Sequence, residues 1–360
     1  MRTSFLVAAT LVLSTLAGSA RAQEFPLTDT TALVADGVPV DAAEFLGRKA
    51  VRIVKPEQGR EGAGFALLRG VDFQDGTIEA DVAVRITRTP AASMPGFIGI
   101  AFRTGPAAAA YDLFYVRPGL ARADDQAARN HVAQYTAAPT YGWYELRRAW
   151  PWVYESHADL RLDGWTHMKI EVAGRVARLY LNGSEQPTLV VDGLKGEKLR
   201  GGVALFGFRG EEAYFSNVRV TAATPQPIAN GSDAAGAWQV TLSTDAGPFE
   251  GRLQLQRQGG ALSGTWSGAL GSDRPVTGTW RDGYVELRFT AQWPKEAGIG
   301  APGDATATLA GWIDGDAGRG RGSVEGRADG QWSATRTRPA PPAGASAATR
   351  PRGQGTRAAR

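Results

Sequence analysis

The chain of 360 residues has no cysteine and only three histidines. Without cysteine it forms no disulfide bond and has neither a thiolate nucleophile nor a cysteine-type zinc site. The histidines, His131, His157 and His167, lie 26 and 10 residues apart, which is not a metal-ligand spacing. We therefore expect no metal centre built on them.

Long apolar runs are also missing, apart from Phe5–Leu16 near the start. That run is shorter than the ~20 residues that span a bilayer. Arg2 precedes it, and the small residues Ala20 and Ala22 follow it, as in secretory signals. We expect residues 1–22 to be a signal peptide cleaved before Gln23. The sequence thus predicts an exported protein, periplasmic or extracellular, without a membrane span.

Acidic residues are absent from both ends of the chain. The net charge of +4 and the pI of about 9.4 depend on two arginines in residues 1–22 and five in residues 338–360. Residues 23–336 alone contain 33 basic and 36 acidic residues, a net charge of −3. We therefore expect no nucleic-acid partner. The basic tail, residues 338–360, is of low complexity and is predicted to be disordered.

Helical periodicity is nearly absent too, with residues 121–133 as the best short candidate. Gly76–Ile86 instead alternates apolar and polar residues, as a half-buried antiparallel strand does. Residues 167–183 form two such runs joined at Ala173-Gly174-Arg175, the pattern of a hairpin. Further short strands are predicted in 51–54, 65–68, 96–103, 111–117, 201–208 and 213–220. This pattern predicts an all-β sandwich over residues 27–222.

The composition changes after a polar linker that is rich in proline and glycine, residues 223–235. Residues 236–337 contain strand-like runs bounded by Gly, Asp or Ser, and two Gly-Thr-Trp units hint at a repeat. About eight short strands in ~100 residues favour a small, lipocalin-like antiparallel β-barrel, because closure removes exposed edges. We expect its tryptophans to pack inside the barrel or line its mouth; they are Trp238, Trp266, Trp280, Trp312 and Trp332.

Aromatic residues are concentrated between Tyr111 and Glu155. This stretch holds six of the nine tyrosines and three of the ten tryptophans, interleaved with arginines and acids. Long irregular connections in compact domains usually carry function, and disordered segments are poor in aromatics. The stretch therefore predicts an ordered binding surface on a β scaffold.

Two motifs carry a family resemblance over about residues 40–221. They are the hairpin Trp165–Gly183, ending in Leu-Tyr-Leu-Asn-Gly, and the strand Ala213–Val220, containing Phe-Ser-Asn. The chain resembles the concanavalin A-like jelly rolls of secreted bacterial proteins, most of all the laminin-G-like and 3-keto-disaccharide hydrolase group. The resemblance implies an all-β protein: a concanavalin A-like jelly-roll sandwich, here followed by the small antiparallel β-barrel.

Saccharide binding is the function that this stretch predicts best. Aromatic rings offer flat apolar faces to sugar C–H groups, while polar side chains orient the hydroxyls. We expect the Trp143–Tyr154 aromatics to form a site, whereas Tyr111 and Phe114 are as readily core residues. The candidate ligand-binding residues are Arg103, Tyr115, Arg117, Asp124, Asn130, Gln134, Tyr135, Arg148, Trp150 and Tyr154.

Two alternatives remain open. Asp125, His131 and Glu155 are candidate catalytic residues, because glycoside hydrolysis needs paired carboxyl groups and histidine exchanges protons near neutral pH. The hydrolase group tends to carry two glutamines where this chain has Phe114 and Phe206, which argues against hydrolysis. The other alternative is a protein-interaction module, because Tyr, Trp and Arg are enriched at interfaces.

No cofactor is implied by the sequence. A structural calcium bound by the acidic pair Asp124 and Asp125 is the one metal ion that the sequence is compatible with. The expected partner is a saccharide ligand, and the oligomeric state is not predicted.

Overall fold

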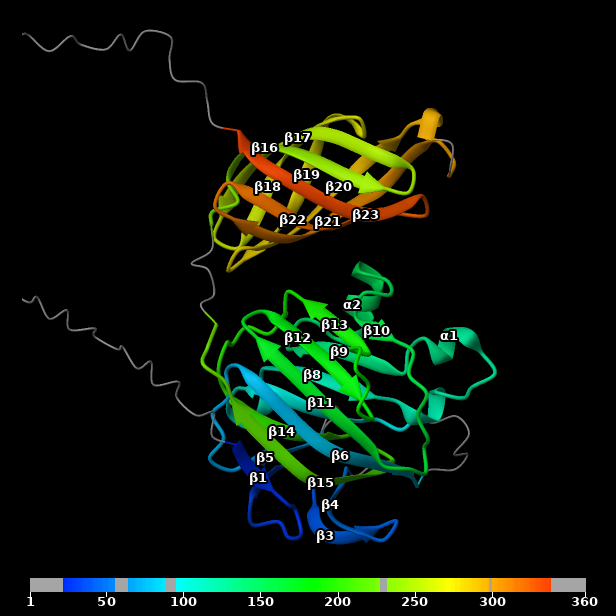
Figure 1. The fold of residues 1–360 in the computed structure, drawn as a ribbon, viewed down its shortest axis with the longest axis vertical. Helices are drawn as coiled ribbons and strands as arrows, with labels where there is room; N and C mark the ends of the chain where they lie inside the picture. The colour runs from blue at the N-terminus through cyan, green and yellow to red at the C-terminus, as the bar shows by residue number, and fades with distance from the viewer. Residues whose placement is uncertain (1–21, 56–63, 88–94, 227–231, 298–299, 338–360) are drawn as a thin grey trace, which may run out of the picture. The chain divides into compact units, whose positions relative to one another are not determined.

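The computed structural model describes residues 22–55, 64–87, 95–226, 232–297 and 300–337 (Figure 1). The chain divides into two compact units, Met1–Ile228 and Ala229–Arg360. Apart from Ala22, the predicted signal peptide lies outside the described residues, as does the basic tail. No helix in the described ranges is long and apolar enough to cross a membrane.

The first unit is a sandwich of two antiparallel sheets. Sheet A has the strand order β13 (Leu189–Asp192), β12 (Val176–Leu181), β11 (Thr166–Ala173), β6 (Gly76–Ile86), β15 (Glu211–Ala222), β4 (Arg48–Val54) and β3 (Val40–Phe45), and β1 (Ala22–Phe25) also pairs with β15. Sheet B has the order β10 (Glu155–Ser156), β9 (Ala133–Ala138), β8 (Tyr111–Val116), β7 (Ile98–Thr104), β14 (Gly202–Gly207), β5 (Gly64–Leu68) and β2 (Leu33–Asp36). The predicted all-β jelly-roll sandwich is confirmed.

Alternation along the strands sets the faces of sheet A. Ile78 and Val82 of β6 are fully buried between the sheets, whereas Asp81 of the same strand points to the outer face. The predicted hairpin is confirmed, since β11 pairs with β12 and Ala173 lies opposite Val176. Gly174 in its turn has a φ of +57°, a left-handed conformation that glycine adopts without a Cβ clash.

Large aromatic side chains fill the space between the sheets. Phe102, Phe114 and Phe215 are fully buried there, and the rings of Phe102 and Phe114 are stacked 6.2 Å apart. Phe206 instead faces outward from sheet B, where it packs against Tyr115 at 5.8 Å. The two phenylalanines that stand where the hydrolase group tends to have glutamines therefore lie on opposite faces of one sheet.

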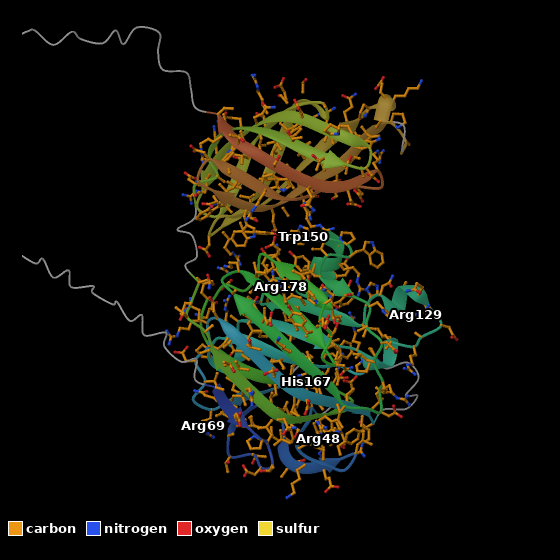
Figure 2. All side chains as sticks on the ribbon, viewed as in Figure 1. Arg48, Arg69, Arg129, Trp150, His167 and Arg178 are labelled. Carbon is orange, nitrogen blue, oxygen red and sulfur yellow. The ribbon has the colours of Figure 1, made fainter. Side chains whose placement is uncertain are left out.

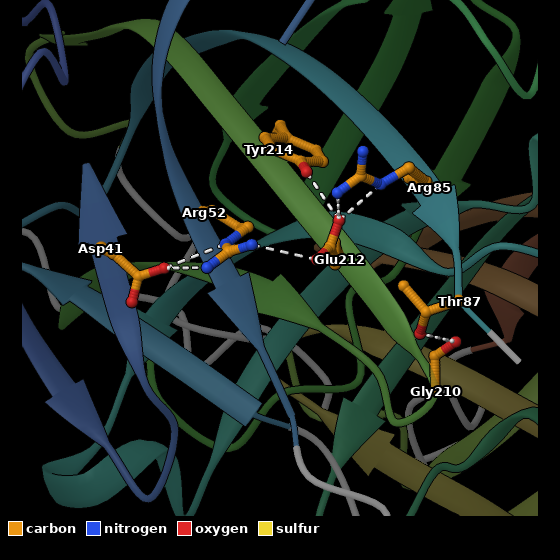
Figure 3. A network of polar contacts seen from close by, with 7 residues as sticks. All are labelled: Asp41, Arg52, Arg85, Thr87, Gly210, Glu212 and Tyr214. Carbon is orange, nitrogen blue, oxygen red and sulfur yellow. Dashed lines mark hydrogen bonds and ion pairs between the residues drawn. The ribbon is translucent and has the colours of Figure 1, made fainter. Parts of the chain in front are cut away.

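The outer face of sheet A is covered by paired charges. Glu212 accepts hydrogen bonds from Arg52 (3.0 Å), Arg85 (2.6 Å) and Tyr214 (2.7 Å), and Arg52 also binds Asp41 (Figure 3). Elsewhere on this face, the carboxylate of Asp81 contacts Arg48 at 2.5 Å and His167 at 2.9 Å. Arg48 and His167 are labelled in Figure 2. These carboxylates therefore have their counter-charges within the sheet.

The second unit is the predicted closed antiparallel barrel, which is confirmed. Each strand pairs with the next and the last with the first; the strands are β16 (Gly236–Thr244), β17 (Gly247–Gln258), β18 (Ala261–Gly268), β19 (Gly271–Arg281), β20 (Tyr284–Trp293), β21 (Gly303–Asp314), β22 (Ala317–Val324) and β23 (Ala328–Thr337). Trp238, Trp266 and Trp332 are buried in the core, and Trp266 stacks on Phe289 at 4.9 Å. Trp312 is only partly buried and packs beside Tyr284 instead.

Both Gly-Thr-Trp units begin where neighbouring strands approach closely. A Cβ on Gly264 would lie 1.9 Å from the carbonyl oxygen of Gln254, and one on Gly278 would lie 2.1 Å from that of Glu286. The repeated glycine is therefore a requirement of strand packing.

Candidate functional site

The aromatic stretch is partly scaffold and partly surface. Tyr111–Val116 and Ala133–Ala138 are β8 and β9 of sheet B, so part of the stretch builds the sandwich itself. Two short α-helices interrupt it, α1 (Gln126–Arg129) and α2 (Trp143–Ala149), and β10 ends it. Figure 2 labels Arg129 of α1 and Trp150, which directly follows α2.

Lys195, in the connection between β13 and β14, holds the segment around α2 against the sandwich. Its ammonium group lies 4.1 Å from the ring centre of Trp150, 5.4 Å from that of Tyr141 and 5.6 Å from that of Tyr154. Only 5% of Lys195 is exposed, and cation–π contacts gain strength when they are desolvated. We call these four residues the lysine anchor.

A second group, the Glu155 cluster, lies at the edge of sheet B and consists of Tyr115, Arg117, His131, Gln134, Arg147 and Glu155. Glu155 Oε1 accepts hydrogen bonds from Arg117 Nη2 at 3.1 Å and from Arg147 Nη2 at 2.5 Å. Its Oε2 accepts one from Arg147 Nε at 2.9 Å. His131 Nδ1 lies 3.0 Å from the same Oε2, so the imidazole packs directly against the carboxylate.

Strand register brings the strand members of this cluster together. Gln134 of β9 lies opposite Tyr115 of β8 on one side and opposite Glu155 of β10 on the other. Its Oε1 accepts hydrogen bonds from Tyr115 at 2.9 Å and from Arg117 at 2.5 Å. Gln134 Nε2 and Arg117 Nε have no hydrogen-bond partner in the described part of the chain, although both atoms are buried. The cluster therefore has two spare buried donors.

Burial and charge act against each other in the cluster. Burial favours a raised pKa for Glu155, but hydrogen bonding and the charge of Arg147, with the charges of His131 and Arg117, outweigh it and lower that pKa. Burial lowers the pKa of His131 although Glu155 acts to raise it, so the imidazole is neutral at pH 7. Burial raises the pKa of Tyr115 to about 12, which leaves a neutral phenol that donates to Gln134. Near neutral pH Glu155 is thus the anionic centre of the cluster.

Exposed aromatic rings lie next to these buried groups. Trp143, Tyr144 and Trp152 are 49%, 57% and 63% exposed, and we call them the aromatic rim. The guanidinium of Arg147 lies 4.9 Å from the ring centre of Trp143. The ring of His131 is parallel to that of Trp152, with an interplanar angle of 2° and centres 5.6 Å apart. Trp152 also has a φ of 66°, a strained conformation for a bulky residue that its surroundings must hold in place.

The structure gathers only some of the residues expected from the sequence. Tyr115, Arg117, His131, Gln134 and Glu155 meet in the Glu155 cluster, whereas Trp150 and Tyr154 belong to the lysine anchor.

Two expected ligand-binding residues instead lie in the interior. Tyr135 is fully buried, donates a hydrogen bond to Asp112 and accepts one from the backbone N–H of Lys195. Arg103 is 1% exposed and forms a buried ion pair with Asp75 at 2.8 Å, because its charge needs compensation away from water. A ligand on the surface reaches neither side chain.

The remaining expected residues lie at or beside the helices. Asp125 caps α1 by accepting a hydrogen bond from the backbone N–H of Ala127, Asn130 ends that helix, and Asp124 precedes it in an exposed position. Arg148 is exposed on α2. None of the four touches Glu155. In the described ranges, no group of three or more His, Cys, Asp or Glu residues is placed to hold a metal ion.

Sequence reasoning missed Arg147 and Lys195. Arg147 follows Trp143 by four residues, which is the spacing of neighbours on one helix face, but no helix was expected there. Lys195 lies 40 residues or more from every aromatic of its anchor, and no local pattern distinguishes it.

No family model matches the chain, and no curated protein sequence does. Among solved structures, carbohydrate-binding module CBM66 from Bacillus subtilis is 17% identical with a TM-score of 0.36, over 53% of this chain and 96% of the module. The exoplasmic/lumenal domain of VIP36 is 12% identical with a TM-score of 0.35, over 53% and 85% of the two chains. Domains LG4-5 of mouse laminin α1 are 12% identical with a TM-score of 0.22, over 76% and 75%. All these TM-scores are below 0.5, and we carry no residue role over from them.

Proposed function

We propose that this protein is an exported carbohydrate-binding protein whose saccharide ligand lies on the aromatic rim. The observation that carries this proposal is the gathering of three exposed aromatic rings within residues 143–152, beside a buried polar cluster. The apolar face of an indole or phenol ring fits the C–H face of a pyranose, and nearby polar groups orient the hydroxyls. Export rests on the signal-like pattern of residues 1–22.

Preorganisation supports binding at this surface. The lysine anchor fixes residues 141–154 on one side, and Glu155 fixes them on the other through Arg147. The rim therefore loses little conformational freedom when a ligand binds, and less of the interaction energy is spent on ordering it.

The test is a glycan array with the secreted chain, followed by calorimetry on the glycans that bind. Trp143→Ala and Trp152→Ala should each weaken binding by about 1–3 kcal/mol, as loss of an aromatic anchor does. Trp312→Ala, on the barrel, is the matched control and should leave affinity unchanged. Absence of binding to any glycan would reject the proposal, and a partner protein captured by the rim would favour the interaction-module alternative.

A glycoside hydrolase, of the 3-keto-disaccharide type, is the second candidate. The 3.0 Å contact between His131 and Glu155 favours it, because a carboxylate can orient an imidazole that acts as a general base. Against it, arginines surround Glu155 and lower its pKa, so this carboxyl is no proton donor near neutral pH. Asp125, the other candidate carboxyl, caps α1.

Product analysis by mass spectrometry, with 3-keto-disaccharides included, separates the two functions. In a binding protein His131→Ala changes affinity only. In an enzyme it abolishes turnover while the substrate still binds, and cleavage of any glycan by the native chain would overturn our preference for binding.

A further inference from the structure

A single buried carboxylate lies behind both exposed tryptophans of the aromatic rim. The side chain of Glu155 is only 3% exposed. On one side it holds Arg147, whose guanidinium lies over Trp143; on the other it contacts His131, whose ring is stacked on Trp152. Each tryptophan thus rests one face on a planar group that contacts Glu155, and 49% of Trp143 and 63% of Trp152 stay exposed.

Hydrogen bonds do not hold these two rings within the described residues. Neither indole N–H donates a hydrogen bond to a residue in the described ranges, whereas those of Trp238 and Trp332 do. Trp143 packs edge-on against Tyr144, which is itself 57% exposed. A tryptophan without such support samples several rotamers, and a ligand must then supply the free energy of ordering it.

We propose that Glu155 is the positioning residue of this surface: through Arg147 and His131 it orients Trp143 and Trp152 so that two sugar rings of one oligosaccharide stack on them. This inference rests on the proposed function and deepens it in two ways. It assigns a role to a residue that the ligand does not touch, and it specifies a ligand of at least two sugar units.

The first experiment measures affinity by calorimetry. The probes are cellohexaose, laminarihexaose and xylohexaose, with glucose and xylose as single-ring controls. A hexaose should bind the secreted chain at least ~10-fold more tightly than its monosaccharide, since it contacts two aromatic anchors. Glu155→Gln should weaken hexaose binding by about 10-fold, while Glu212→Gln, another buried carboxylate with several donors, should not change it.

A mutant cycle shows whether Glu155 acts through the rings. In a Trp143→Ala/Trp152→Ala background, Glu155→Gln should cause no further loss, because the groups that it orients are gone. If Glu155→Gln fails to fold, Arg147→Lys tests the same idea at a partly exposed position. It keeps the charge but loses the planar stack on Trp143, so it should weaken hexaose binding. This loss of affinity should vanish in a Trp143→Ala background.

The second experiment needs no ligand. A protonated imidazole quenches the fluorescence of an indole stacked on it, so the difference between the native chain and Trp152→Phe reports the titration of His131. The midpoint should lie below the usual 6.5, because burial and the charges of Arg147 and Arg117 outweigh the opposing effect of Glu155. Glu155→Gln removes the one nearby group that raises the pKa of His131, and should move the midpoint to still lower pH.

The outcomes distinguish the two proposals. Failure of every saccharide to bind overturns the proposed function. If Glu155→Gln leaves saccharide binding unchanged, only the positioning role is overturned. The same holds if the loss of affinity caused by Glu155→Gln adds in full to the loss caused by removing the two tryptophans. A fluorescence midpoint that does not move in Glu155→Gln overturns that role as well.

Discussion

Two neighbouring glutamates on β15 lie in opposite environments and should respond to pH in opposite directions. Glu211 is 1% exposed; its Oε2 accepts a hydrogen bond from the backbone N–H of Phe97 at 2.6 Å, and its Oε1 has no hydrogen-bond partner among the described residues. Glu212 faces the other side of sheet A, where Arg52, Arg85 and Tyr214 surround it (Figure 3).

The two pKa shifts have different causes. Burial raises the pKa of Glu211 to about 7, although backbone N–H groups of Phe97 and Gly96 act against it. Burial also favours a raised pKa for Glu212, but hydrogen bonds from Tyr214 and Arg85 and the charges of the two arginines outweigh it and lower that pKa. Glu211 is therefore favoured as the neutral acid and Glu212 as the anion.

The raised pKa of Glu211 makes the folded state less stable at alkaline pH. Its stabilising contribution is fully present below the usual value of 4.5 and is lost as the pH rises through about 7. At 1.36 kcal/mol per pKa unit, the shift corresponds to about 3 kcal/mol between pH 4 and pH 8. Glu212 has the opposite effect on the pH dependence of folded-state stability. Its stabilising contribution is present above pH 4.5 and is lost as the pH falls through the lowered pKa.

Glu211→Gln replaces the acid by a neutral group of the same shape. We expect it to raise the free energy of unfolding at pH 8 by about 2–3 kcal/mol relative to the native chain, and to have little effect at pH 4. Glu212→Gln should lower the free energy of unfolding at pH 8 by about 1–3 kcal/mol, because the substitution removes an ionised acceptor shared by three donors. Urea unfolding of the full chain, followed by tryptophan fluorescence from pH 4 to pH 8, measures both changes. A Glu211→Gln chain that is less stable than the native one at pH 8 would refute the reasoning, because Glu211 would then be stabilised as an anion.

Three further predictions concern other parts of the chain. Lys195→Met should lower the free energy of unfolding by about 1–2 kcal/mol in urea, through loss of the cation–π contacts, while the exposed control Lys198→Met should not. Gly264→Ala should destabilise the barrel by about 1–3 kcal/mol in thermal unfolding, because its Cβ meets a neighbouring carbonyl, whereas Gly260→Ala has room and should be tolerated. Limited proteolysis should cut within residues 223–235 and leave two folded fragments; resistance there would contradict the linker predicted from the sequence.

Much of the fold could be predicted from the sequence because a strand's faces are set locally. In β6 every second residue is apolar, so Ile78 and Val82 had to share one face and Asp81 had to take the other. Gly174 marked the hairpin turn for the same local reason, since glycine adopts positive φ without strain. The barrel followed from short glycine-bounded strands that had to avoid free edges.

The candidate site could be predicted only in part. The sequence placed Tyr115, Gln134 and Glu155 in one aromatic stretch, but only the register of β8, β9 and β10 puts them side by side. Alternation likewise requires Gln134 and Tyr135 to face opposite ways, yet does not say which of the two faces the core.

Tertiary structure alone decided which charges serve the surface and which serve the interior. Arg103 is paired with Asp75 across 28 positions of the chain, and Lys195 reaches aromatics 41 or more positions away. Such pairings depend on which strands become neighbours and on how much water each group loses, and neither quantity is encoded in a local stretch of residues. The sequence by itself thus determined strands, turns and the concentration of aromatics. The stacking of two tryptophans over groups held by one carboxylate arose only when distant segments packed together.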